Sequence, residues 1–342
     1  MNERIQQRPA SATVHDPLRS LQQRALQAVA DTPFVPQRYG TAFHITAPYP
    51  DVRNLPLNRF TATPTVPPLL DTLSAPDQER LLAFDSNDTY LAWHLAHADR
   101  LPIVLLHLNE GETREVALPP EAPDTSAVLW IVLEKGASLT LTELVEHSNF
   151  RMRRIKVIQH AESTFTYFNV RSSNLFSNEQ IHVHLMGRDA SAEVTHMVLG
   201  QGTEQADIAV RVYHEAPVTT SNVKVRTAVL SKATVMYRGL INVAREAHGT
   251  AGYQQGKALM LSPTAVADLL PELEINTNDV RCSHGVSTMH LDDAALFYLR
   301  SRGLGVQAAR QLAIQGFFAQ GLQLPTSIQT ALAKAIDTLT IN

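Results

Sequence analysis

The sequence predicts a mainly β chain with helical segments at both ends. Through the middle, apolar and polar residues alternate with a period of two, as in residues 138–143, 181–185 and 208–212. No long pattern of period 3.6 interrupts this region for about 200 residues, so a sheet built from β–α–β units is not expected. Helical patterns with one apolar stripe occur near the start of the chain and after Leu291.

We expect three regions along the chain. Residues 1–72 form an N-terminal helix and a proline-rich wrapping segment, residues 73–287 the β core, and residues 288–342 a C-terminal helical module. The first helix is predicted to open at Asp16 and Pro17, because Asp is a favoured N-cap and Pro suits the first helical position.

Turn signals such as Lys135-Gly136 and residues 186–189 punctuate the middle region. The favoured hairpin dipeptides Asn-Gly and Asp-Gly are absent, which weakens the case for a sandwich of tight hairpins. A solenoid of short strands is equally compatible with the pattern. Periodicity alone does not choose between these two folds.

Three helices are expected after the β region. Asp292 and Asp293 stand where a helix N-terminus favours negative charge, and Gly303 suits the position after a helix end. A second helix is predicted over residues 306–319 and a third over residues 326–339.

Composition narrows the classes of function. The chain has 342 residues, 44% of them hydrophobic, and a net charge of -4, which argues against a general nucleic-acid binder. The single cysteine excludes an internal disulfide and a four-cysteine cluster within one chain, and it suits a reducing, cytoplasmic location. No segment resembles a signal peptide, and no apolar run reaches the roughly 20 residues that span a bilayer.

Several motifs carry a resemblance to a known family. Residues 279–285 read Asp-Val-Arg-Cys-Ser-His-Gly, and residues 296–303 read Leu-Phe-Tyr-Leu-Arg-Ser-Arg-Gly. Residues 134–138, 214–221 and 235–243 add weaker matches. Together these segments resemble the SufB/SufD family of the SUF iron–sulfur cluster assembly system, and within it the SufD branch. Asn278 and residues 286–290 depart from the family pattern.

The resemblance implies a right-handed parallel β-helix core with helical ends. It also implies a non-catalytic scaffold in iron–sulfur cluster biogenesis that pairs, as a dimer, with a SufB-like paralogue or with itself. The C-terminal helices would then recruit a SufC-like ABC ATPase in a SufB–SufC–SufD complex. The residues expected to dock it are Leu296, Phe297, Tyr298, Arg300 and Arg302, although this apolar run is also compatible with a core role alone.

The sequence has no Gly-x-x-x-x-Gly-Lys-Ser/Thr loop, so ATP hydrolysis by this chain is not expected. We expect neither a stably bound cofactor nor a nucleic-acid or membrane partner. An iron ion or iron–sulfur cluster is expected only transiently.

Cys282 and His284 are the candidate site for that iron. Strand alternation places both side chains on one face, and a thiolate with an imidazole can share a soft metal. A neighbouring imidazolium would favour the thiolate. An iron–sulfur cluster needs about four protein ligands, so the missing ones would come from a partner chain at a dimer interface. The alternative is that Cys282 is a small buried hydrophobe and His284 closes the last turn of the solenoid.

Other polar pairs in the β region have simpler interpretations. His182 and His184 share a face, but no third metal ligand is evident, so a solvated strand face is expected. His214 is expected to serve a turn or to stack within the solenoid. Glu272 and Glu274 are expected on a solvated face.

A β-helix enzyme acting on polysaccharide is the alternative function. Such an enzyme would use clustered carboxylates, or a carboxylate with an arginine, on the face of the solenoid. Aromatic residues make up only 6% of the chain, which is few for stacking on sugars, and no export signal is expected from the polar N-terminal residues.

Overall fold

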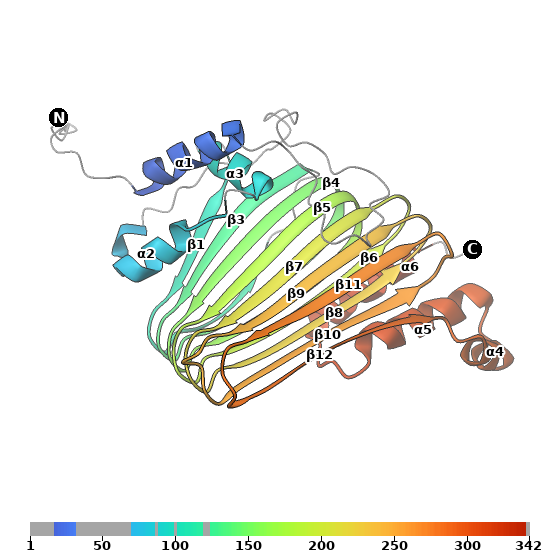
Figure 1. Ribbon diagram of the computed structural model, residues 1–342. Coiled ribbons are helices and arrows are strands. Elements are labelled where there is room, and N and C mark those ends of the chain that lie inside the picture. Colours follow the sequence, from blue (N-terminus) through green and yellow to red (C-terminus); the bar gives the residue numbers. More distant parts are fainter. Residues whose placement is uncertain (1–16, 32–69, 86–87, 99–100, 119–123, 340–342) are drawn as a thin grey trace, which may run out of the picture.

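The strands wind into a parallel β-solenoid that is flanked by helices (Figure 1). The computed structural model describes residues 17–31, 70–85, 88–98, 101–118 and 124–339. Every strand pair in this part of the chain is parallel. The predicted fold class, a parallel β-helix core with helical segments at both ends, is confirmed.

The strands form two faces. One contains β2 (Thr113–Ala117), the first half of β4 (Ser138–Gln159), the first half of β5 (Thr164–Leu185), β6 (Ser191–Gly200), β8 (Thr220–Val229), β10 (Thr250–Met260) and β12 (Val280–His290). The other contains β1 (Ile103–Leu108), β3 (Asp124–Leu133), the second halves of β4 and β5, β7 (Gln205–His214), β9 (Thr234–Val243) and β11 (Val266–Ile275). β4 and β5 have 22 residues each, because each rounds a corner and serves both faces.

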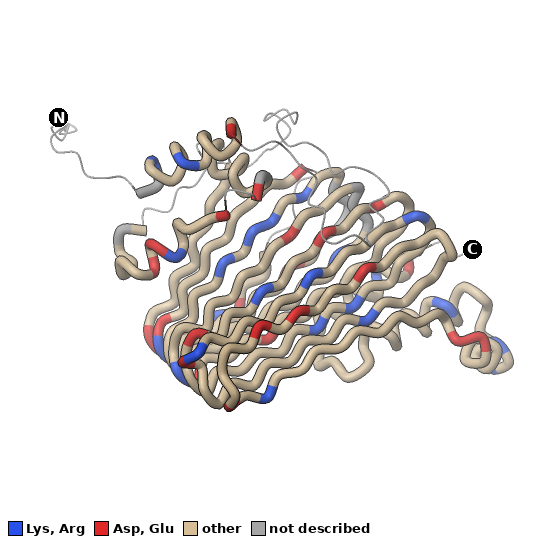
Figure 2. Tube along the Cα trace, viewed as in Figure 1, with Lys and Arg blue, Asp and Glu red and all other residues tan. Residues whose placement is uncertain are grey.

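The core lies between the two faces. Alternate residues of each strand point inward, and the predicted apolar positions in residues 139–141, 181–185, 208–212 and 223–225 are all buried there. Val and Ile dominate these positions because branched side chains pack well on a pleated surface. Residues of both signs of charge are distributed along the strands (Figure 2).

Successive coils turn at one corner through a residue with positive φ. Gly136, Glu162, Asp189 and Val218 occupy this position with φ between 59 and 68°. Hydrogen bonds join these turns from coil to coil, as from Gly136 N to the carbonyl of Ala161 at 2.8 Å. The predicted turns around Gly136 and Asp189 are confirmed.

Helices α1 (Pro17–Asp31), α2 (Ala75–Leu82) and α3 (Thr89–Ala96) lie beside the first coils and pack on the outer surface of β1, β3 and β4 (Figure 1). The helix expected after Pro17 is confirmed. The expectation that strands begin at Leu73 is wrong, because α2 and α3 precede the first strand. Ser74 and Asp88 cap them by accepting hydrogen bonds from the first turn. The proline-rich segment 33–68 lies outside the described residues.

Helices α4 (Asp293–Ser301), α5 (Val306–Ala319) and α6 (Thr326–Asp337) follow the last strand, as predicted. α5 and α6 pack on the outer surface of the face that contains β6, β8 and β10. Arg226 of β8 fixes the end of α5 by donating to the carbonyls of Phe317 (2.6 Å) and Phe318 (2.9 Å). β12 runs to His290, beyond the expected end of the β region, and its Met289 packs against these helices.

A network of buried ion pairs lies at the corner where β4 and β5 pass between the faces. Arg151 bridges Glu143 (2.7 Å) and Glu179 (2.6 Å). Arg171 bridges Glu179 (2.6 Å) and Glu204 (3.0 Å). All five side chains are at most 1% exposed, so each charge depends on its partner for compensation.

Candidate functional site

The last strands, β11 and β12, lie at an open end of the solenoid. Among the described residues, β11 is hydrogen-bonded only to β9 and β12 only to β10, so each has one edge without a neighbouring strand (Figure 1). Apolar side chains face solvent here, with Ile275 41% and Val286 48% exposed. A free edge with exposed apolar side chains is a surface on which another strand can pair.

Cys282 lies on β12 and packs against the end of the core. The residue is half-buried and contacts the cluster formed by Ile241, Val243 and Ala247. It stands opposite Gly252 of β10, and a Cβ added at position 252 would lie 3.3 Å from Sγ. The thiol therefore occupies space that the absent side chain of Gly252 leaves open.

His284 follows two residues later on the same open strand. It stands opposite Gln254 of β10 and is exposed. A hollow of about 310 Å³ beside it is lined by Asn222, Lys224, Tyr253, Gln254, Gln255, Ser283, His284 and Gly285. The imidazole is thus accessible to a metal ion or to a partner chain, whereas Cys282 is accessible only in part.

The surroundings of Cys282 in the isolated chain do not favour its thiolate. Burial raises the pKa of its thiol, although a backbone hydrogen bond at Gly252 acts in the opposite direction. His214 is a further imidazole near the thiol, because a Cβ at position 252 would lie 3.5 Å from His214 Nε2. Burial lowers the pKa of His214 to about 4, so this ring is neutral at physiological pH. It therefore supplies no charge that would favour a thiolate.

His214 serves a turn, as the sequence predicts. The ring is fully buried, and its Nδ1 and Nε2 atoms each lie 2.8 Å from a hydroxyl, those of Thr219 and Ser221 respectively. Glu272 and Glu274 are exposed on β11, as expected. Both ring nitrogens of His214 are thus engaged by hydroxyl groups, so this residue is not a free metal ligand for Cys282.

Helix α4 presents the residues expected to dock an ATPase. No residue of α4 is buried, and Phe297 and Tyr298 are 74% and 55% exposed. The guanidinium of Arg302 lies 5.1 Å from the centre of the Tyr298 ring. Leu296 is half-buried and Arg300 is exposed. The apolar residues 296–298 therefore do not serve only as part of a core.

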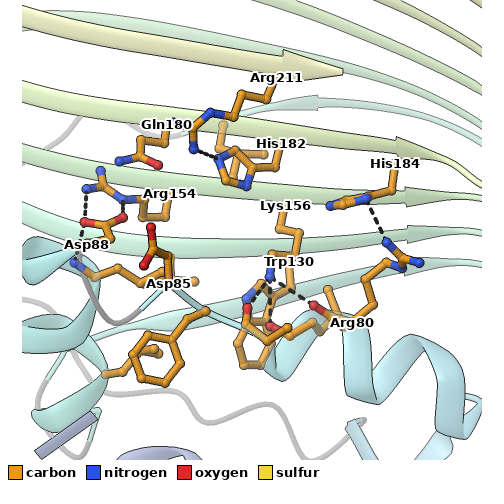
Figure 3. A pocket seen from close by; sticks show the side chains of 17 residues that line it. Arg80, Asp85, Asp88, Trp130, Arg154, Lys156, Gln180, His182, His184 and Arg211 are labelled. Atoms are coloured by element: carbon orange, nitrogen blue, oxygen red, sulfur yellow. Dashed lines mark hydrogen bonds and ion pairs between the residues drawn. The ribbon is translucent and has the colours of Figure 1, made fainter. Parts of the chain in front are cut away.

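His182 and His184 do not lie on a solvated face, contrary to expectation. They line a cavity of about 270 Å³ between α2, α3 and the outer surface of β3, β4, β5 and β7 (Figure 3). His184 Nδ1 lies 2.8 Å from Glu215 Oε1. Burial, with Arg211 nearby, holds the pKa of His182 well below its usual value, so its Nε2 accepts from Arg211 at 3.3 Å.

Three of the cations that line this cavity join α2 and α3 to the solenoid. Arg154 pairs with Asp88 at 2.7 Å, and Arg80 pairs with Glu215 at 2.8 Å. Lys156 Nζ donates to carbonyls at the end of α2, including those of Arg80 (3.0 Å) and Ala83 (2.5 Å). These contacts fasten the two helices to the solenoid.

A family model for the SufBD core domain of the SUF iron–sulfur cluster assembly system matches residues 104–317. The match extends from β1 to α5 and includes the open end with Cys282 and His284. The chain belongs to the SufB/SufD family.

Individual relatives agree with this assignment. The chain is 28% identical over 204 residues to the chloroplastic protein ABCI7 of Arabidopsis thaliana, covering 58% of this chain and 42% of the relative. It is 34% identical over 136 residues to the iron–sulfur cluster assembly protein SufD of Escherichia coli, covering 40% of this chain and 32% of the relative. The matches thus span less than half the length of these two SufB/SufD relatives. Among the described helices, none has the length and apolar character needed to cross a membrane.

Proposed function

We propose that this SufB/SufD chain is a non-catalytic scaffold subunit in iron–sulfur cluster biogenesis. It pairs with a SufB-like paralogue, or with a second copy of itself, through the open edges of β11 and β12. Cys282 and His284 then contribute to a transient cluster or iron site that the two chains share. A SufC-like ABC ATPase docks on α4 and supplies the nucleotide-driven step.

The open end of the solenoid is the observation that carries this proposal. The edges of β11 and β12 offer unpaired backbone groups, and Ile275 and Val286 add exposed apolar surface. Pairing with strands of another chain would satisfy those groups and bury those side chains. The strand that carries the metal-ligand pair is therefore also the strand best suited to bind a partner.

Ligand chemistry supports a shared site. Cys282 and His284 provide one thiolate, once deprotonated, and one imidazole, whereas a cluster needs about four protein ligands. A partner chain on β12 would bring its own side chains to the same edge. An iron ion there would also supply the positive charge that the isolated chain lacks and would favour the thiolate.

The exposed surface of α4 supports ATPase docking. Phe297 and Tyr298 lie beside basic Arg300 and Arg302, and Leu304, Val306 and Leu312 are further exposed apolar residues after α4 and in α5. Contiguous exposed apolar surface rimmed by charge is typical of protein–protein contact sites.

The alternative, a polysaccharide-active enzyme, has less support. Three carboxylates that lie close to arginines, those of Glu143, Glu179 and Glu204, are buried inside the solenoid. A polymer on the outer surface does not reach these groups, and their charges are already compensated by Arg151 and Arg171. General acid–base catalysis requires groups that contact the substrate.

A charge introduced at the open edge tests the proposal. Ile275→Lys adds a cation where a partner strand would lie, and it should leave the monomer folded because Ile275 is 41% exposed. Val104→Lys is the matched control, since Val104 is a 40% exposed strand residue on β1 at the other end of the solenoid. Both variants are co-expressed with the SufB-like paralogue and the ABC ATPase of the same host.

We expect Ile275→Lys to lose co-purification with the paralogue and to reduce cluster formation after anaerobic reconstitution, while Val104→Lys behaves as wild type. Retained pairing and wild-type cluster content in Ile275→Lys would refute the proposed interface. Cleavage of a pectin or glycan substrate by the purified chain would favour the enzyme instead.

A further inference from the structure

Asp77, Glu134 and His160 bring three metal-ligand groups together at one corner of the solenoid, several coils away from β12. One ligand atom from each lies within 4.8 Å of the others. They come from α2 and from the turns that follow β3 and β4, so residues far apart in the sequence meet here.

The fold fixes each of these groups. The backbone N–H of Glu134 donates to Leu108 in the preceding coil and that of His160 to Leu133, so the two turns stack directly on each other. Asp77 lies in the first turn of α2, where Ser74 caps the helix and donates to Asp77 Oδ2 at 2.7 Å. The helix end is thereby held against the two turns.

The distances suit a small cation. His160 Nε2 lies 3.2 Å from Asp77 Oδ2 and 4.0 Å from Glu134 Oε2. Zinc binds imidazole nitrogen and carboxylate oxygen at about 2.0–2.2 Å, which places neighbouring ligands about 3–4 Å apart. The second oxygen of Glu134, Oε1, lies 2.9 Å from His107 Nε2, so a second imidazole orients this carboxylate.

A separate observation concerns the buried carboxylate of Asp77. The side chain of Asp77 is 2% exposed, and its Oδ1 atom has no hydrogen-bond partner among the described residues. A buried carboxylate oxygen without a partner is costly, and an ion or an ordered water is the usual explanation in native proteins. Glu134 and His160 keep the cluster open to solvent, with side chains 36% and 30% exposed.

We propose that Asp77, Glu134 and His160 form a binding site for one divalent d-block cation, with His107 as the positioning residue for Glu134. A set of imidazole and carboxylate ligands selects zinc-like or iron(II)-like ions over magnesium and calcium, which prefer oxygen alone. Bound metal would link α2 to the β3 and β4 turns and so fasten the N-terminal helices to the solenoid.

A purely structural ion pair is the competing explanation. The hydrogen bond to Asp77, opposed in part by burial, raises the pKa of His160, so an imidazolium can bridge the two carboxylates. That arrangement needs no metal and would not respond to one. Metal titration therefore separates the two explanations.

The test uses the untagged full chain carrying Cys282→Ser and His284→Ala, which removes the other candidate metal site. Co²⁺ is titrated with its visible absorption as the readout, and Zn²⁺ is titrated by competition and by thermal unfolding. Asp77→Asn and His160→Gln remove ligands at nearly constant shape. Glu162→Gln is the control. Glu162 lies in the same turn as His160, but its side chain is 59% exposed and pairs with Lys135, outside the proposed ligand set.

We expect one equivalent of Co²⁺ or Zn²⁺ per chain and a metal-dependent rise in Tm. Affinity should fall about 100-fold in Asp77→Asn and in His160→Gln, and about 10–100-fold in His107→Gln, but should be unchanged in Glu162→Gln. Circular dichroism confirms that each variant folds. Absence of stoichiometric binding, or binding that survives both ligand substitutions, would leave the cluster as a structural ion pair and overturn the proposal without affecting the role of β12.

Discussion

Cys282 of β12 stands opposite Gly252 of β10, and its thiol lies where a side chain at position 252 would point. This pairing with a glycine explains how Cys282 can lie close to the core although β12 is an edge strand. The absent side chain of Gly252 leaves space for Sγ, beside Ile241 and the buried ring of His214.

A methyl group at position 252 should therefore disturb the candidate site. A Cβ there would lie 3.1 Å from Ile241 and 3.3 Å from Cys282 Sγ, which is tight contact. We expect Gly252→Ala to cost about 1–3 kcal/mol of the free energy of unfolding and to speed thiol modification of Cys282 by pushing it outward. Gly285→Ala on β12 is the control, because nothing lies within 4 Å of a Cβ there. Equal stability and equal thiol reactivity in the two variants would contradict this packing.

Loss of one buried carboxylate should unbalance the ion-pair network. Glu143 contacts Arg151 at 2.7 Å and Arg153 at 2.6 Å, and it is 1% exposed. Glu143→Gln leaves arginine charge uncompensated inside the solenoid, so we expect a loss of about 3–5 kcal/mol in the free energy of unfolding. Urea denaturation followed by circular dichroism measures this. A loss below about 1 kcal/mol, typical of exposed pairs, would show that the network contributes little.

The same network predicts a specific loss of stability in acid. Burial acts to raise the pKa of Glu143, but Arg151 and Arg153 outweigh it and lower the pKa to about 2. The pKa of Glu179 is lowered by Arg151 and Arg171 in the same way. Because these folded-state values lie below the unfolded ones, the stabilisation is complete above about pH 4.5 and is lost as the pH falls toward 2.

The free energy of unfolding should fall as the pH is lowered from 6 to about 2.5, roughly the range in which carboxylates titrate. Glu143→Gln should show a shallower slope than wild type, because it removes one of the titrating groups. Parallel slopes in the two proteins would mean that Glu143 does not titrate with a lowered pKa.

The exposed rings of α4 should matter for binding and not for folding. Phe297 is 74% exposed and lies in a helix with no buried residue, so Phe297→Asp should leave Tm within a few degrees of wild type. We expect it to abolish pull-down of the ABC ATPase, whereas Leu26→Asp on α1, at a 51% exposed position, should not. Deleting everything after Leu291 is a poorer test, because α5 and α6 cover an apolar face of the solenoid. Undiminished ATPase binding by Phe297→Asp would place the docking surface elsewhere.

The strands and the C-terminal helices could be predicted from the sequence because their patterns are local. Alternation indicates inward residues such as Ile181 and Val183, and a single apolar stripe indicates α6. Helices α2 and α3 were not predicted. They have 8 residues each, and the apolar residues of α3 lie all round the helix, so α3 shows no clear apolar stripe. The N-cap residues Ser74 and Asp88 are the sequence features that indicate them.

The positions of Cys282 and His284 on one strand follow from their spacing, but the environment of the thiol does not. The contact with Gly252 and His214 depends on register between strands, which a single pattern does not specify. The cluster of Asp77, Glu134 and His160 was missed for the same reason. Residues 134 and 160 occupy equivalent turns of successive coils. A comparison of recurring turn positions along the sequence would have predicted that these two residues lie close together.

The iron content of the assembled pair tests the central claim most directly. Complexes of this chain with its SufB-like paralogue are reconstituted anaerobically with iron and sulfide, and iron and sulfide per pair are measured for wild type, His284→Ala and Cys282→Ser. If β12 supplies cluster ligands, His284→Ala should lower the cluster content about tenfold or more while sedimentation shows an intact pair. Cys282→Ser should lower it as well, by a smaller factor, because the thiol is partly buried and also packs against the core. Wild-type cluster content in both variants, with pairing intact, would contradict the proposed role of this strand.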